Sequence, residues 1–116
     1  MNYDTLLEEL FGAFPEIKEY VRNEEYLEGL PHCICDIVFV PYIIKVCKTG
    51  SAEKIGKICR FLEKMAQSFD TEVTEVLNVS VLEPLILDES DVTDILQEYM
   101  GTETKKELQY WKERYS

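Results

Sequence analysis

The sequence predicts an all-α fold, either a compact bundle or a short HEAT-like stack of antiparallel helical pairs. Between Ser51 and Leu87, apolar residues recur at steps of three and four with one short break, which is the pattern of two consecutive helices. Similar patterns joined by short turns cover much of the remaining chain. We expect one domain, 1–116, because 116 residues match the usual domain size and 46% of them are hydrophobic.

The first 30 residues predict two short helices. Thr5 and Glu8 fit a capping box at the start of the first, and Gly12 and Pro15 end it. Its apolar face comprises Leu6, Leu7, Leu10, Phe11 and Phe14. Pro15 can start the second helix, and Gly29-Leu30-Pro31 closes it. The residues expected to face inward from it are Ile17, Tyr20, Val21 and Leu27.

Residues 31–50 are ambiguous. The stretch from His32 to Val40 is rich in Ile, Val, Cys and Phe, which fits a buried strand or a buried loop. A proline inside a helix costs ~3 kcal/mol but is tolerated in the first turn. We therefore expect an extended or irregular stretch to about Phe39 and a short helix from Pro41 to Lys48. Its inward residues would be Ile43, Ile44 and Cys47, with Gly50 at its end.

The central helical hairpin has the clearest pattern. Ser51 stands at an N-cap position, and Ser68-Phe69-Asp70 interrupts the pattern so that Asp70 can cap the second helix. The first inward face comprises Ile55, Ile58, Cys59, Leu62, Met65, Ala66 and Phe69. The second comprises Val73, Val76, Leu77 and Ser80, opposite Glu72, Glu75 and Asn78. From Val79 to Leu87 the helix is apolar nearly all round, so we expect that end to be buried.

Two more helices complete the chain. Ser90 or Asp91 would cap the first, which ends at Gly101, and Thr102 would cap the last. The inward residues of the first are Val92, Ile95, Leu96, Tyr99 and Met100. Those of the last are Leu108, Trp111 and Tyr115.

The formal net charge is −11, and its distribution is uneven. Residues 70–101 carry nine acids and no base. Nucleic acid is therefore an unsuitable partner, because phosphate contacts need Lys and Arg. An acidic face suits a basic partner protein, although composition alone favours the simpler explanation that the acids keep the protein soluble.

No membrane segment or secretory signal is expected. The N-terminus lacks a basic, apolar and small-residue pattern. The longest apolar run, Cys33–Cys47, contains Asp36, Pro41 and Lys45, whereas a membrane helix needs ~20 predominantly apolar residues. We expect a cytoplasmic monomer.

The sequence supplies one histidine and four cysteines, enough in number for a zinc site. His32, Cys33 and Cys35 lie close together, but Cys47 and Cys59 have no near partner of the usual zinc-site spacing. Apolar neighbours favour cysteines that pack in the core as free thiols, since disulfides are rare in a reducing cytoplasm. We expect no metal and no cofactor.

No pattern predicts an enzyme. The sequence has no serine-centred elbow, no glycine-rich phosphate loop and no H-E-x-x-H motif. His32 beside Cys33 or Cys35 could form a dyad only if their side chains converged, and adjacent residues on a strand point apart. The acids from Asp88 to Asp94 lack the alternating ligands, central glycine and terminal glutamate of an EF-hand.

Three stretches resemble a known family. They are Arg60–Ala66, Asp70 with Glu72-Val73, and Val76–Leu85, and the fragment Tyr99–Thr104 resembles the same family's closing turn. The family consists of small acidic bacterial proteins of uncharacterised function, and the resemblance covers about the C-terminal two thirds. Such proteins are similar to helical immunity proteins, which neutralise secreted toxins of rival bacteria. The resemblance implies a fold and carries no catalytic residue onto this chain.

The leading functional hypothesis is a non-catalytic protein-binding module, and its specific form is an immunity protein that blocks a basic toxin domain. The alternative is a regulatory or adaptor domain with another protein partner, and a thiol- or metal-dependent enzyme is a third class. The residues expected to form one binding surface are Glu72, Glu75, Asp91, Asp94 and Glu98.

Overall fold

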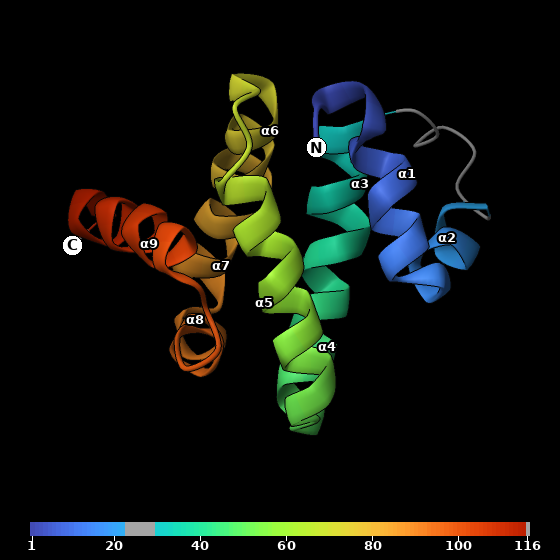
Figure 1. Cartoon of the computed structure of the whole chain (residues 1–116). Helices are drawn as coiled ribbons and strands as arrows, with labels where there is room; N and C mark the ends of the chain where they lie inside the picture. The colour runs from blue at the N-terminus through green and yellow to red at the C-terminus, as the bar shows by residue number, and fades with distance from the viewer. Residues whose placement is uncertain (23–29, 116) are drawn as a thin grey trace.

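A computed structural model of the chain describes residues 1–22 and 30–115, and these residues form helices and turns without a strand. The predicted all-α fold is confirmed (Figure 1). The elements are α1 (Tyr3–Ala13), α2 (Pro15–Arg22), α3 (Pro31–Ile34), η2 (Cys35–Phe39), α4 (Val40–Thr49), α5 (Ala52–Ala66), α6 (Thr71–Glu75), η3 (Val76–Leu82), α7 (Glu83–Asp88), α8 (Ser90–Gln97) and α9 (Thr102–Tyr115).

The expectation of a strand or loop before Pro41 is wrong. Residues 31–49 form one continuous helical segment, in which α3 and α4 are joined by the π-helical stretch η2. The joining residues Ile34 and Val40 have helical backbone angles, at φ −65°, ψ −43° and φ −60°, ψ −49°. A second continuous segment, residues 71–88, is built in the same way, with η3 between α6 and α7.

The predicted helix starts are only partly correct. Ser51 and Asp70 cap α5 and α6 as expected, and Gly50 ends α4 with φ 75°, a conformation that suits glycine. The N-terminal capping box, however, pairs Asn2 with Thr5 and leaves out Glu8.

The two C-terminal helices also start differently from the prediction. α8 begins at Ser90 with Glu89 at the N-cap and no side-chain capping bond. α9 begins at Thr102, and the backbone N–H groups of Glu103 and Thr104 donate to the carboxylate of Glu63 on α5. Glu63 therefore fills the capping role that the sequence assigned to Thr102.

The core joins the N-terminal helices to the central ones. Three aromatic rings form a cluster with centroids 5.5–5.9 Å apart: Phe14, which follows α1, Phe39 of η2 and Phe61 of α5. α5 runs through the centre of Figure 1, with α1 and α2 on one side and α9 on the other. Other fully buried large side chains include Leu6, Leu10, Ile17, Ile34, Ile43, Ile58, Leu62, Met65 and Leu77.

Several side chains predicted to be buried lie at the surface. Phe69, in the turn between α5 and α6, is fully exposed, and Val79 and Leu87 are about half exposed, at 46% and 56%. The other exposed residues that were expected to face inward are Tyr20, Tyr99 and Tyr115. The expected inward position of Leu27 lies outside the described residues.

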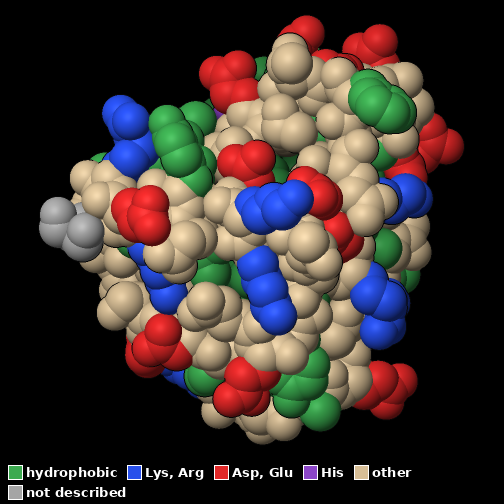
Figure 2. Space-filling view, turned by 60° about the vertical axis from the view of Figure 1, so that its left-hand side comes forward, with side chains coloured by type: hydrophobic (Ala, Val, Ile, Leu, Met, Phe, Trp, Pro, Cys, Tyr) green, Lys and Arg blue, Asp and Glu red, His purple; other side chains and the backbone are tan. Residues whose placement is uncertain are grey.

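The surface is mixed in charge on at least one side. Figure 2 brings the α9 side forward and shows Lys and Arg side chains among carboxylates, with small separate hydrophobic patches. Among the described helices, none combines the length and the apolar character needed to cross a membrane.

Candidate functional site

The most unusual feature of the fold is that two π-helical stretches each precede a proline. Pro41 follows η2 after one intervening residue, and Pro84 follows η3 in the same way. In each stretch the residue before the proline donates its backbone N–H five residues back, Val40 to Cys35 and Glu83 to Asn78. π-helical turns are rare and often occur at functional sites.

Proline explains why the helices widen there. Inside an α-helix a proline lacks the N–H that would bond four residues back, and its ring clashes with that carbonyl. A π turn holds one extra residue, so it relieves the clash while the helix continues. Pro41 was expected to follow an extended segment, whereas the chain accommodates this proline inside a helix by a local π turn.

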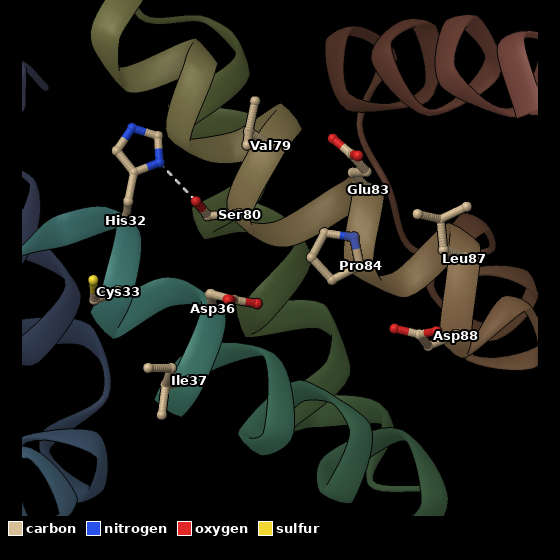
Figure 3. Close-up of a pocket in the computed structure, with 10 residues that line it drawn as sticks. All are labelled: His32, Cys33, Asp36, Ile37, Val79, Ser80, Glu83, Pro84, Leu87 and Asp88. Atoms are coloured by element: carbon tan, nitrogen blue, oxygen red, sulfur yellow. Dashed lines mark hydrogen bonds between the residues drawn. The ribbon is translucent and has the colours of Figure 1, made fainter.

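The two widened helices pack against each other and leave a groove between them. η2 and α3 both contact η3. The groove has a volume of about 490 Å³, and Figure 3 shows its walls. Its lining residues are His32, Cys33, Asp36 and Ile37 from α3 and η2, and Val79, Ser80, Glu83, Pro84, Leu87 and Asp88 from η3 and α7.

One hydrogen bond joins the two walls. The Nδ1 atom of His32 lies 2.7 Å from the Oγ atom of Ser80 (Figure 3). Ser80 is buried and His32 is half-buried, so water competes little for the bond. Their contact fixes the spacing of the two helices at one end of the groove.

The groove combines acidic and apolar groups. Asp36 and Asp88 extend toward each other from opposite walls in Figure 3, and Glu83 lies near the rim. No Lys or Arg is among the lining residues that the structure describes. Ile37, Val79 and Leu87 are 50%, 46% and 56% exposed, so their apolar surface is available to a binding partner.

The cysteines divide into a buried set and one accessible residue. Burial raises the pKa of Cys35 to about 12, of Cys47 to about 11 and of Cys59 to about 12, so these thiols stay protonated near neutral pH. Cys33 is half-exposed and lines the groove. Within the described chain, no three His, Cys, Asp or Glu side chains are grouped to hold a metal ion.

The pair of His32 and Ser80 has the separation of a base and a nucleophile, but the surroundings do not complete such a site. In the described part of the chain, the His32 ring forms no hydrogen bond other than the one with Ser80, so no third group orients the ring. Ser80 lies within a helical segment, and its side chain is buried. No hydrogen bond joins the Cys33 thiol to the His32 ring in the described chain, where the ring is paired with Ser80.

The five residues predicted to bind a partner are all exposed but do not lie together. Glu72 and Glu75 are on α6, Asp91 and Asp94 are on α8, and Glu98 follows α8. α6 and α8 lie toward opposite ends of the molecule in Figure 1. The structure therefore divides the predicted surface into two groups, with η3 and α7 between them in the chain.

One known family covers most of the chain. The model of a family described as a domain of unknown function, DUF7674, matches residues 7–116. The chain belongs to DUF7674. The matched region includes every groove residue, and it extends further toward the N-terminus than the resemblance noted from the sequence. Comparison with curated proteins and with solved structures found no match.

The groove of this DUF7674 chain was not predicted, although the sequence carries a signal for one of its walls. Val79, Glu83 and Leu87 recur every four residues, as do Ser80, Pro84 and Asp88. Because residues four apart lie above one another on a helix, these six side chains form two parallel rows on one helical face. A mixture of acidic, apolar and proline residues in those rows is unsuited to a packed core and indicates an accessible surface.

Proposed function

We propose that this protein is a non-catalytic binding module for a basic partner protein. The observation that supports this proposal is the excess of carboxylates in residues 70–101 that have no Lys or Arg ion-pair partner in the described chain. Of the nine acids in residues 70–101, two form ion pairs within the described structure, Glu89 with Lys48 and Asp94 with Lys112. The others create a negative potential that attracts a cationic partner and speeds its association.

The simplest competing explanation is that the carboxylates only keep the protein soluble. The two explanations differ in their salt dependence. Steering by charge weakens as salt shortens the Debye length from about 30 Å at 0.01 M to about 8 Å at 0.15 M. A general solubility effect implies no particular partner and no such change in an association rate.

More specifically, we propose that the chain is an immunity protein of the bacterial cytoplasm, which neutralises a basic toxin domain by direct contact. It rests on the sequence resemblance to helical immunity proteins and on the acidic helices. A regulatory or adaptor module would use the same surface toward a partner that is not toxic.

The test begins with affinity capture from bacterial cells that carry the gene, followed by mass spectrometry. We expect a basic protein in stoichiometric amount, and an association rate for the purified pair that falls steeply with ionic strength. A rate that does not change with salt would reject the proposal. Co-expression then separates its two forms, since an immunity protein restores growth to cells that produce the partner and an adaptor does not.

A further inference from the structure

We propose that the groove between η2 and η3 is the docking site for a basic amphipathic α-helix of the partner protein. The inference rests on the proposed function and assigns that function to a site other than the residues predicted from sequence. Its basis is the shape of the groove, its apolar surface and its charge.

The shape fits a helix. The wall formed by η3 and α7 presents two parallel rows, one of Val79, Glu83 and Leu87 and one of Ser80, Pro84 and Asp88. These rows cover about ten residues, or about 15 Å of helix length at 1.5 Å per residue. A groove between two helices that presents such rows can receive the ridges of a third helix.

The apolar surface supplies an anchoring region. Ile37 on one wall and Val79 and Leu87 on the other remain about half exposed although they line the groove. Pro84 adds a rigid apolar surface between the two walls, as Figure 3 shows. An occupant with aliphatic residues at helical spacing would cover these side chains and remove them from water.

The charge of the groove indicates that the occupant is basic. Asp36, Glu83 and Asp88 line it, and no described lining residue is basic. None of the three forms an ion pair with a described Lys or Arg. Lys or Arg residues beside the aliphatic stripe of the occupant would therefore meet carboxylates on both walls.

The groove is pre-organised. The hydrogen bond between His32 and Ser80 joins the walls at one end, and each π-helical stretch is followed by a proline, whose fixed φ restricts the backbone there. Walls restricted in this way lose less conformational entropy when the occupant binds.

A synthetic peptide of leucine and lysine provides the probe. Leucines at helical spacing on a chain of about 14 residues give roughly four turns with one apolar and one basic face. One control peptide replaces every lysine with glutamate, and another alternates the same residues in a strand-like pattern. We expect only the helical basic peptide to bind wild-type protein, measured by fluorescence anisotropy, and to gain helicity in circular dichroism.

Three double variants of equal net charge locate the binding site. Asp36→Lys with Asp88→Lys changes the groove, Asp91→Lys with Asp94→Lys changes α8, and Glu8→Lys with Glu53→Lys changes exposed positions outside the groove. Each pair raises the formal net charge from −11 to −7. We expect the groove pair to weaken peptide binding by about tenfold or more and the other two pairs by about threefold or less.

A fourth variant separates apolar contact from charge. Leu87→Ser leaves the net charge unchanged and removes an exposed apolar side chain from the groove, so it should weaken binding by about tenfold. Circular dichroism of each variant checks that the fold is retained.

Cys33 reports occupancy independently of affinity. It is the one described cysteine that is not buried, and it lines the groove. Saturating peptide should slow its reaction with a maleimide by about fivefold or more, on the ordinary expectation that burial shields a thiol. The glutamate peptide should leave the rate unchanged.

The outcomes distinguish the two proposals. Absence of peptide binding, equal losses in all three charge variants, or an unprotected Cys33 in the bound state would overturn the groove assignment. If the Asp91→Lys, Asp94→Lys variant loses more peptide affinity than the groove variant, the binding site lies on α8 instead. In each of these cases, a captured basic partner with a salt-dependent association rate would still support the proposed function. If the protein binds no peptide but self-associates as its concentration rises, the groove would be assigned to a second copy of the chain.

Discussion

Glu63 on α5 caps α9 through Thr104, 41 residues further along the chain. Its Oε1 atom accepts hydrogen bonds from the backbone N–H of Thr104 at 2.8 Å and from the Thr104 hydroxyl at 2.7 Å. The N–H of Glu103 donates to the other carboxylate oxygen at 3.2 Å. A negative charge at a helix N-terminus is also favoured by the helix dipole. This one side chain therefore ties the C-terminal helix to the centre of the fold.

The first prediction concerns the charge of Glu63. Partial burial alone would raise the pKa of Glu63, but the hydrogen bonds from Thr104, Gln67 and Glu103 outweigh burial and hold that pKa below its ordinary value. The carboxylate thus contributes stability above the unfolded pKa of about 4.3, and the contribution is lost as the pH falls through the lower folded pKa. Glu63→Gln should reduce the free energy of unfolding at pH 7 by about 1 kcal/mol.

Chemical denaturation at pH 7 and at acid pH measures this effect. The difference between wild type and Glu63→Gln should shrink as the pH falls below the folded pKa of Glu63. Glu72→Gln, at an exposed position on α6, serves as the control and should have little effect. A difference that stays constant across this pH range would show that the carboxylate charge has no role in the cap.

The second prediction links Glu63 to Gly101. A Cβ atom at Gly101 would lie 2.5 Å from the Cδ atom of Glu63, which is too close for two nonbonded carbon atoms. Gly101→Ala should therefore push the Glu63 carboxylate away from α9 and lower stability by about 1 kcal/mol. In a protein that already carries Glu63→Ala, Gly101→Ala should leave the free energy of unfolding almost unchanged. A double-mutant cycle measured by denaturation gives the coupling, and additive effects would contradict the steric explanation.

The regular helices could be predicted because their sequence patterns agree with their environments. α5 is amphipathic and begins at a serine cap, and its face from Ile55 to Met65 is buried as expected. The pattern failed at Phe69, which continues the spacing but falls after α5 ends at Ala66. A hydrophobic period gives the direction of a side chain only while the helix continues.

The groove could not be predicted by the same reasoning, because it depends on how two segments meet. Pro41 normally interrupts a helix, and local sequence does not show that a π turn absorbs it. The apolar run from Val79 to Leu87 suggested burial on all sides, but no described helix covers the side that bears Val79 and Leu87. Asn78 was expected at the wet face, whereas its Oδ1 atom is buried. These outcomes are set by tertiary packing.

The third prediction tests the hairpin core. Leu62 and Leu77 are fully buried, so Leu62→Ala and Leu77→Ala should each reduce the free energy of unfolding by about 2–5 kcal/mol through the cavity they leave. Phe69→Ala is the matched control, since its ring is fully exposed and the change should lie within about 0.5 kcal/mol. Equal melting temperatures for Leu77→Ala and wild type would mean that the inward face is misplaced.

The fourth prediction concerns thiol reactivity. Near pH 8 a maleimide should modify the native protein at Cys33 alone, because Cys35, Cys47 and Cys59 are buried and their raised pKa values leave almost no thiolate. Intact mass spectrometry should show one adduct, and Cys33→Ser should show none. Denatured wild type should gain four. Two or more rapid adducts on the folded protein would contradict the described burial.

The fifth prediction addresses the bond that joins the walls of the groove. Ser80→Ala removes the partner of His32 Nδ1 and should reduce the free energy of unfolding by about 0.5–1.5 kcal/mol. Ser90→Ala is a suitable control, because Ser90 is exposed and lies at the first position of α8, outside the groove. Chemical denaturation of both variants gives the comparison, and equal stability would mean that the bond adds nothing to the folded state.

The same pair also tests whether this protein is an enzyme. A serine that acts as a nucleophile must be reachable, and its base needs a third group to orient it. Ser80 is 5% exposed, and in the described chain the His32 ring has no hydrogen-bonding partner besides Ser80. We therefore expect no covalent adduct after incubation with a fluorophosphonate, as measured by intact mass. An adduct that mapped to Ser80 and disappeared in His32→Ala would establish a catalytic dyad and reject a purely binding role for the groove.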